Sequence, residues 1–273
     1  MGKSTMNKYF LLGYLFLFIC SHAQATSSVL IEIDRGRTEG IFNKSPVFQR
    51  AILIKPTEPT DTALLFFRGY PGVERIDGLN GHFIRPPLSR QVDTFLTNGI
   101  AMVVMDCPTD QWATCKDSYR SSQEHADDVR SVMAKLRDEH RISKFYLMGH
   151  SMGSVSSRWL AKNLGKEIAG SIHSASMNRA PPDGFAYSVW KFPYNSITTP
   201  ILHIHHENDG CNYTPYSIVK EYAGEHLVTV RGGNPEGDPC RIHLHSYDGR
   251  QDVVAQSIIK WIKTKEVDKF VGE

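Results

Sequence analysis

The segment FYLMGHSMG, residues 145–153, constrains the fold of this chain more than any other part. An apolar run leads into a Gly-x-Ser-x-Gly motif formed by Gly149, Ser151 and Gly153. The residues from Met152 to Leu164 then place apolar side chains at helical spacing and stop at a glycine. A strand, a sharp turn and a helix in this order put the serine on a strained turn, and the flanking glycines let strand and helix approach closely.

Further apolar runs alternate with helix-period segments along the chain. Several of them are continuously apolar, which is typical of parallel strands buried on both faces of a sheet. The predicted strands are Arg50–Lys55, Ala63–Phe67, Ile100–Met105, Lys144–Met148, Ile168–His173, Pro200–His205 and His226–Val230. Strands that alternate with helices form right-handed βαβ units. We therefore expect the α/β class, with a mostly parallel, twisted sheet flanked by helices on both faces.

Two more helices have clear signals. Ser121 and Glu124 have the spacing of a capping box, and apolar residues follow them at helical intervals. The last helix carries an apolar stripe that includes Val254 and Trp261. Residues 26–49 give no comparable pattern, so the sequence leaves the start of the domain undecided.

The N-terminal residues have the pattern of a secretory signal peptide. Two lysines precede an apolar run from Tyr9 to Cys20, and an Ala-Gln-Ala cleavage site follows. The run is about 12 residues long, whereas a membrane span needs about 20. A lipoprotein anchor at Cys20 is disfavoured because the bulky Ile19 precedes it. We expect residues 1–25 to be removed and the product to be exported, periplasmic or secreted, without a stable membrane span.

The remaining residues, 26–273, are predicted to form a single domain. The whole chain has 31 Lys and Arg against 29 Asp and Glu. Two of the lysines belong to the leader, so the charges of the mature domain are balanced. This balance gives no indication of a nucleic-acid partner.

The mature domain keeps four cysteines, Cys107, Cys115, Cys211 and Cys240. An even number in an exported protein favours disulfides, and four cysteines allow three pairings. We expect the pairs Cys107–Cys115 and Cys211–Cys240. Free or metal-bound thiols are the alternative, which is weakened because the chain has no C-x-x-C motif.

The strand, serine turn and helix resemble the nucleophile elbow of α/β-hydrolases, and the resemblance covers about residues 45–265. It implies that Ser151 is a nucleophile and that the Met152 N–H, at the start of the following helix, is an oxyanion donor. It also implies an acid in the loop after a later strand, where this chain has Asp209. Glu207 is the alternative acid, although it lies closer to the end of the strand.

The resemblance further implies a base histidine after the last strand. His245 lies in HLHSYDG just before the final helix, where related hydrolases often have His-Gly-Phe-x-Gly. His243 is the rival, because it lies on the same side of an extended chain. In such a triad Asp209 orients the imidazole, and His245 takes the Ser151 proton and delivers it to the leaving group.

The segment RGYPG, residues 68–72, resembles the H-G-x-P-G loop that supplies the second oxyanion donor in this family. Arg68 stands in place of the usual histidine. The resemblance implies the backbone N–H of Tyr70 as the donor beside that of Met152. The Tyr70–Pro71 peptide could adopt either isomer, with trans favoured.

The segment ILHIHHENDGC, residues 201–211, also suggests a metal site. His203 and His205 share one face of a strand and could be joined by His243 and His245. However, the H-x-H-x-D pattern of metallo-hydrolases is not completed after His205. We therefore expect no catalytic metal and interpret the strand histidines as packed, hydrogen-bonded residues.

An aromatic stretch between His173 and Pro200 could either line an acyl pocket or pack in the core. Its members are Phe185, Tyr187, Trp190, Phe192 and Tyr194. Trp112, between the first two cysteines, is another possible wall. The stretch is too short for a large cap domain.

We therefore expect an exported serine hydrolase that cleaves small-molecule carboxylic esters through an acyl-serine intermediate, without a cofactor. Thioesterase, amidase, peptidase and acyltransferase activities would use the same triad, so they stay open. A non-catalytic binding protein that kept the fold is the alternative from another class. The complete Ser–Asp–His order argues against it, because nothing structural demands all three residues.

Overall fold

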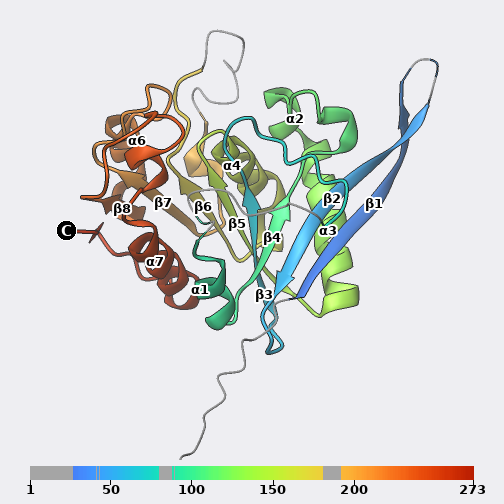
Figure 1. The fold of residues 1–273 in the computed structure, drawn as a ribbon, viewed down its shortest axis with the longest axis horizontal. Coiled ribbons are helices and arrows are strands. Elements are labelled where there is room, and N and C mark those ends of the chain that lie inside the picture. Colours follow the sequence, from blue (N-terminus) through green and yellow to red (C-terminus); the bar gives the residue numbers. More distant parts are fainter. Residues whose placement is uncertain (1–26, 41, 43, 80–87, 89, 181–191) are drawn as a thin grey trace, which may run out of the picture.

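The computed structural model describes residues 27–40, 42, 44–79, 88, 90–180 and 192–273. One sheet with the strand order β1-β2-β4-β3-β5-β6-β7-β8-β9 runs through the centre of the molecule (Figure 1). The strands are β1 (Ser27–Glu39), β2 (Ser45–Lys55), β3 (Thr62–Phe67), β4 (Ala101–Met105), β5 (Lys144–His150), β6 (Gly170–Ser174), β7 (Ile201–His206), β8 (Leu227–Val230) and β9 (Phe270–Val271). Every strand predicted from the sequence is present, with shifted ends.

The sheet is mostly parallel, as predicted. β2 pairs antiparallel with β1 and β4, and the other neighbouring strands of the described sheet pair in parallel. The carboxyl ends of parallel strands meet at one edge, beyond which α/β proteins bind their ligands. Ser151, Asp209 and His245 follow β5, β7 and β8, so all three lie in connections that leave this edge.

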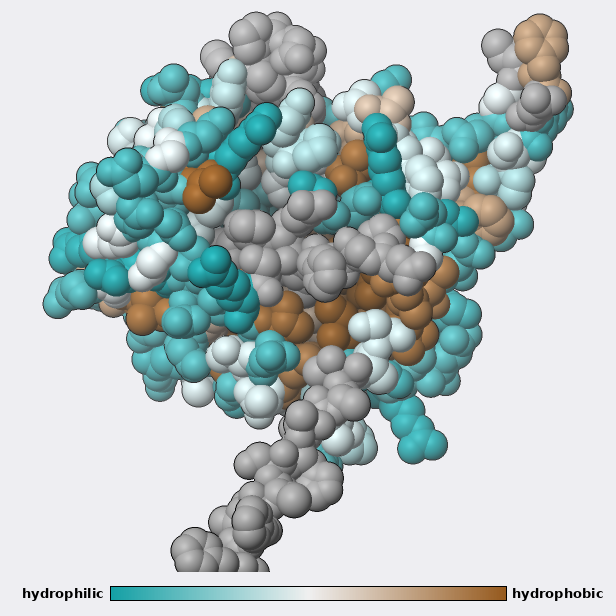
Figure 2. Space-filling model, in the orientation of Figure 1, coloured by the Kyte–Doolittle hydropathy of each residue, from teal (hydrophilic) through white to brown (hydrophobic). Residues whose placement is uncertain are grey.

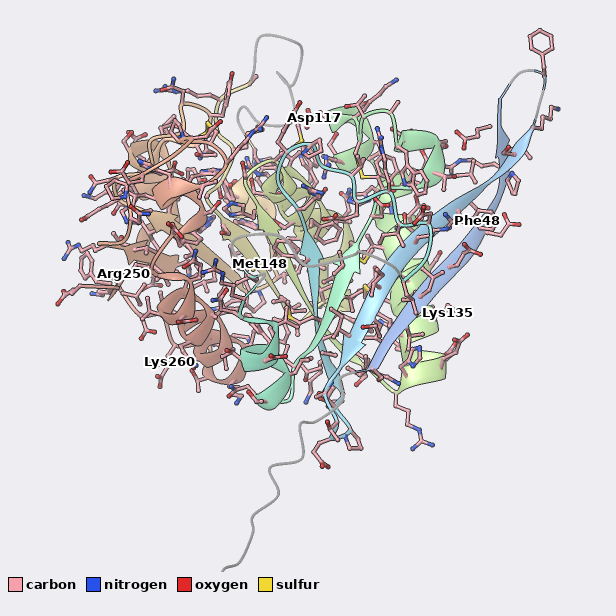
Figure 3. The ribbon with its side chains drawn as sticks, in the orientation of Figure 1. Phe48, Asp117, Lys135, Met148, Arg250 and Lys260 are labelled. Carbon is pink, nitrogen blue, oxygen red and sulfur yellow. A yellow bond between two sulfur atoms is a disulfide. The ribbon has the colours of Figure 1, made fainter. Side chains whose placement is uncertain are left out.

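Helices cover both faces of the sheet, which also confirms the prediction. α1 (Val92–Thr97) and α7 (Gln251–Thr264) pack on one face, and α3 (Gln123–His140) and α4 (Gly153–Leu164) pack on the other (Figure 1). Met148 lies fully buried in the middle of the sheet, whereas Lys135 of α3 and Lys260 of α7 lie at opposite sides of the molecule (Figure 3). The fold therefore has three layers with two hydrophobic interfaces.

Shorter elements complete the connections. The other α-helices of the described residues are α2 (Asp117–Arg120) and α6 (Tyr216–Ala223). The 3₁₀ turns are Thr109–Gln111, Gly165–Glu167, Tyr194–Ser196, Gly224–His226 and His243–Ser246. α4 ends at Gly165, whose φ of 53° is the left-handed region that glycine favours, so this predicted helix end is confirmed.

The capping box predicted at Ser121 is wrong by one residue. The N-cap of α3 is Ser122, whose side chain accepts a hydrogen bond from the His125 N–H at 3.1 Å. The Ser121 hydroxyl instead donates to the Asp117 carbonyl at 3.0 Å. Ser121 closes the preceding helix α2, which leaves the next serine to begin α3.

The start of the domain, left undecided by the sequence, is a β-hairpin. β1 pairs with β2 from Ser27 to Glu39, and the two strands project beyond the rest of the sheet (Figure 1). On the face shown in Figure 2, hydrophobic side chains gather around β2 and β4, while mainly hydrophilic ones cover α6 and α7. The predicted signal peptide lies outside the described residues. Among the helices that are described, none combines the length and apolar character needed to cross a membrane.

Candidate active site

Ser151 lies on a sharp turn between β5 and α4. Its φ of 54° is unusual for a residue with a side chain, and it marks a strained backbone of the predicted kind. A Cβ on Gly149 would lie 2.1 Å from the Gly153 carbonyl oxygen, and a Cβ on Gly153 would lie 2.0 Å from the Phe67 carbonyl oxygen. Both positions therefore require glycine, because strand and helix cross there at backbone contact distance.

Asp209 and His245 meet beyond the carboxyl ends of β7 and β8. The Asp209 Oδ2 accepts a hydrogen bond from the His245 Nδ1 at 2.9 Å, and both side chains are buried. Burial alone would raise the pKa of Asp209, but hydrogen bonds from His205 and His245 outweigh it and hold this pKa well below its usual range. An ionised carboxylate only accepts hydrogen bonds. His245 must therefore carry its proton on Nδ1, which leaves Nε2 as the basic nitrogen.

Three further donors fix the Asp209 carboxylate. The Thr214 hydroxyl donates to Oδ2 at 2.9 Å, and the Cys211 N–H donates to Oδ1 at 2.9 Å. The His205 Nε2 lies 3.1 Å from Oδ2 and 2.8 Å from the Thr214 carbonyl oxygen. The sequence suggested only a scaffolding role for His205, whereas the structure places it directly on the predicted acid.

Ser151 and His245 line one cavity of about 370 Å³. The His245 Nε2 is buried and has no hydrogen-bond partner among the described residues, and it makes no hydrogen bond to the Ser151 hydroxyl in this structure. Such nucleophile–base contacts often tighten only when substrate binds. His150, whose pKa burial holds well below its usual value, also lines the cavity and stays neutral.

The Arg68–Gly72 loop forms another wall of this cavity. A Cβ on Gly69 would lie 3.2 Å from the Ser151 Cβ, so the loop passes directly beside the serine. The Tyr70–Pro71 peptide is cis, the isomer that the sequence did not favour. Within the described chain, neither the Tyr70 N–H nor the Met152 N–H donates to another protein group. Tyr70 lines the cavity, whereas Met152 is not among its described lining residues, so the Met152 N–H stays a predicted oxyanion donor.

Arg120 hydrogen-bonds to the Arg68–Gly72 loop and stabilises it. The sequence did not point to this residue. Its Nη2 donates to the Gly72 carbonyl at 2.7 Å, and its Nη1 donates to the Ser156 hydroxyl at 2.8 Å. Burial lowers the pKa of Arg120 to about 10, so the guanidinium stays charged at neutral pH. Asp106 anchors the next residues by accepting the N–H groups of Glu74 and Ile76, each at 2.8 Å.

Tyr247 fixes the connection that carries His245. This fully buried residue donates its hydroxyl to the Ile204 carbonyl at 2.8 Å and accepts the Ala175 N–H at 3.1 Å. The base loop, residues 231–250, is thereby tied to the ends of β6 and β7. A tyrosine two residues after a histidine gives no sequence signal for such a role.

Both expected disulfides are present. Cys107 pairs with Cys115, and Cys211 pairs with Cys240. The second bridge joins the acid loop, residues 207–215, to the base loop. It therefore connects the two segments that carry Asp209 and His245.

The alternative acid and base lie elsewhere. Glu207 accepts a hydrogen bond from the Arg231 Nε at 3.1 Å. His243 is not among the described residues that line the cavity. The structure therefore brings Asp209 and His245 together and leaves their rivals outside the pair.

The remaining histidines of β7 pack or bond within the fold. His203 packs against the rings of His173, Tyr194 and Tyr222. His206 donates through Nε2 to the Gly232 carbonyl at 2.7 Å. Among the described residues, no group of three His, Cys, Asp or Glu side chains is arranged to hold a metal ion.

The aromatic residues suggested as pocket walls are only partly described. Phe185, Tyr187 and Trp190 lie outside the described residues. Phe192 and Tyr194 pack beside the buried Arg158 guanidinium rather than along the cavity. Trp112 is also not a described wall of the cavity, and its indole N–H donates to the Cys107 carbonyl at 3.1 Å.

Known proteins match the chain in sequence pattern and in fold. The family model of serine aminopeptidase S33 matches residues 89–206. No protein of curated function matches the sequence. The solved structures that match include the esterase Pf2001 of Pyrococcus furiosus, which has 15% identity over 96% of this chain and 98% of that one, with a TM-score of 0.58. A dienelactone hydrolase from Anabaena variabilis has 15% identity over 89% and 99% of the two chains, with a TM-score of 0.58.

A third match, Est1E from Butyrivibrio proteoclasticus, has 14% identity, covers 80% of this chain and 94% of that one, and has a TM-score of 0.53. At these identities the three structures share the fold and no more. The shared fold nevertheless extends over at least 80% of the chain in each case. The residues that the family model matches include strands β4, β5, β6 and β7 and the serine turn. The chain therefore has the α/β-hydrolase fold.

Proposed function

We propose that this protein is a serine hydrolase that cleaves carboxylic esters with the triad Ser151, His245 and Asp209. One observation carries the proposal. The His245 imidazole is held by an ionised carboxylate at Nδ1, its Nε2 has no partner in the described structure, and His245 lines the same cavity as the strained Ser151. The name of one structural neighbour, the esterase Pf2001, also supports it.

The proposed reaction has two stages. Ser151 Oγ attacks the ester carbonyl carbon as its proton passes to the His245 Nε2, and Asp209 stabilises the resulting imidazolium. The N–H groups of Tyr70 and Met152 bind the negative charge on the carbonyl oxygen. The intermediate then expels the alcohol, which takes the proton from His245 and leaves an acyl-Ser151 ester. Water, deprotonated by His245, attacks this ester and releases the acid and the free serine.

The matching family's name, serine aminopeptidase, suggests peptide cleavage as a second candidate. An aminopeptidase must bind the α-ammonium group of its substrate, and a carboxylate is the natural partner for that charge. None of the described cavity-lining residues is Asp or Glu, whereas Arg68 and Arg241 both line it. Arg68 is paired with Glu74, but the exposed Arg241 guanidinium would repel an ammonium group, so the cavity favours ester hydrolysis over aminopeptidase activity.

We also propose that the protein is exported. The leader pattern of residues 1–25 supports export, and so do two disulfides, which persist in oxidising compartments. N-terminal sequencing of protein collected outside the cytoplasm should give a chain that begins near Thr26. Material that begins at Met1 would contradict the proposal.

The nucleophile is tested by replacing Ser151 with alanine. We expect this variant to fold, to lose hydrolysis of p-nitrophenyl acetate and butyrate, and to lose labelling by a fluorophosphonate probe. Ser196→Ala, which changes an exposed serine in a 3₁₀ turn, is the matched control. Wild-type turnover by the Ser151 variant would refute the triad. Absence of both labelling and turnover in the wild-type protein would favour a non-catalytic binding protein.

A further inference from the structure

The described walls of the candidate cavity carry positively charged side chains and no negatively charged ones. Two arginines, Arg68 and Arg241, line it together with Ser151 and His245, and no described lining residue is acidic. Asp209, the proposed acid, is not a described lining residue, and it accepts hydrogen bonds from His245, His205 and Thr214. A substrate in the cavity therefore meets cationic side chains without a competing carboxylate in the described walls.

Arg68 is a constrained cation at the edge of the Arg68–Gly72 loop. Its Nη1 donates to the Val73 carbonyl at 3.2 Å and to the Glu74 carboxylate at 3.0 Å. Its Nε is buried and has no hydrogen-bond partner in the described structure. Glu74 offsets part of this charge, but the guanidinium keeps a donor that no described protein group satisfies.

Arg241 is the less neutralised of the two cations. Its side chain is 71% exposed, and its nearest described carboxylate, that of Asp238, lies 3.8 Å away and is 54% exposed. Its backbone is fixed, because its carbonyl accepts the Ser246 hydroxyl at 2.7 Å and the preceding Cys240 is held by a disulfide. The position of Arg241 beside His245 is therefore set, while its guanidinium can turn toward a ligand.

We infer that the site selects esters whose acyl chain also carries a free carboxylate, which Arg241 and Arg68 would bind while Ser151 attacks the ester carbonyl. Guanidinium groups bind carboxylates through paired, charge-assisted hydrogen bonds, and these gain strength where water is partly excluded. The same charges disfavour substrates with ammonium groups. This inference rests on the proposed esterase function and adds the substrate class to it.

The test compares two p-nitrophenyl esters of the same length, both built on a six-carbon diacid. One acyl chain ends in carboxylate and the other ends in carboxamide, so they differ in charge and little in shape. We expect kcat/KM to be about tenfold higher for the carboxylate ester at low salt. The preference should shrink to about threefold or less in 1 M NaCl, where the Debye length is about 3 Å.

Variants of charged residues show which side chain causes the preference for the carboxylate ester. Arg241→Gln should reduce the carboxylate-to-carboxamide ratio by about threefold, as expected for a largely exposed cation. Arg241→Glu should bring the ratio below one. Asp238→Asn, which removes the nearest carboxylate, should increase it. The matched control is Lys144→Gln, which removes an exposed cation at the opposite end of β5 and should leave the ratio unchanged.

The outcomes separate this inference from the proposed function. Wild-type protein that hydrolyses both esters at equal rates, or prefers the carboxamide, would overturn the inference and leave the esterase function intact. A ratio that survives in both Arg241 variants would overturn the role of Arg241. A protein that binds fluorophosphonate at Ser151 yet hydrolyses neither ester also contradicts the substrate class. Equal hydrolysis by Ser151→Ala would instead refute the proposed function itself.

Discussion

The Cys211–Cys240 disulfide joins the acid loop to the base loop at the point where the candidate triad depends on both. The Cys211 N–H donates to the Asp209 Oδ1 at 2.9 Å, and Cys240 lines the cavity beside His245. Replacing both cysteines with alanine removes the bridge without leaving a reactive thiol. We expect this double variant to lose both stability and activity.

The expected loss of stability follows from the length of chain that the bridge closes. The two cysteines are 29 residues apart, for which the loop-closure entropy corresponds to about 3.6 kcal/mol at 25 °C. Cys107 and Cys115 are 8 residues apart, which corresponds to about 2.6 kcal/mol. Cys107→Ala/Cys115→Ala is therefore a matched control that loses a similar amount of stability without touching the acid or base loop.

The activities of the two double variants should differ more than their stabilities. A misplacement of about 1 Å in a catalytic group costs on the order of 100-fold in rate. We expect kcat/KM on p-nitrophenyl butyrate to fall at least about tenfold without Cys211–Cys240, and to stay within about threefold of wild type without Cys107–Cys115. Urea unfolding and kinetics at 25 °C, both on the folded fraction, measure the two effects. Equal activity losses in the two variants would refute the specific link between this bridge and the triad.

Three other predictions concern the turn, the acid and the loop. Gly149→Ala places a Cβ 2.1 Å from the Gly153 carbonyl oxygen and should lower the unfolding free energy by about 3 kcal/mol or more, whereas Gly78→Ala, with open space around it, should change it by less than about 0.5 kcal/mol in the same urea titration. The depressed pKa of Asp209 contributes stability above its unfolded pKa of about 3.9, and this contribution is lost as the pH falls toward the folded value. Unfolding free energies measured from pH 7 to pH 2 should therefore fall more steeply for wild type than for Asp209→Asn, and parallel curves would contradict the assignment. Arg120→Leu leaves the buried carbonyls of Gly72 and Cys115 without their donor, so it should lower the unfolding free energy by about 3 kcal/mol. It should also lower kcat, so that kcat/KM falls by more than the change in KM accounts for. A variant with unchanged kcat would show that Arg120 supports the fold without positioning the loop.

The sequence predicted the elements whose signals are local. The central strands are continuous apolar runs, and such runs are rarely compatible with an exposed segment. The serine turn was predictable because Gly149 and Gly153 each stand where a side chain would strike the backbone. Asp209 and His245 followed from their order along the chain once the turn had been recognised.

The supports of the site could not be predicted in the same way, because they act between distant residues. Arg120 bonds to the Gly72 carbonyl across 48 residues, and Tyr247 bonds to the Ile204 carbonyl across 43. No local pattern indicates such a partner. Strand β1 was not predicted for a different reason. Its residues alternate between exposed and partly buried positions and include many charges, so its apolar signal is weak.

The histidine-rich strand β7 was predicted from the sequence, but the contacts of its histidines were not. The His205 Nε2 faces two acceptors, the ionised Asp209 carboxylate and the Thr214 carbonyl, so it must carry a proton and donate. His205 and His245 therefore approach the same carboxylate oxygen as donors, one from the strand and one from the base loop. These two nitrogens cannot bind a metal ion, because each of them donates its proton to Asp209. Of the histidines that suggested a metal site in the sequence, His205 and His245 are donors that keep Asp209 ionised and fixed, and the Nε2 of His245 has no hydrogen-bond partner in the described structure.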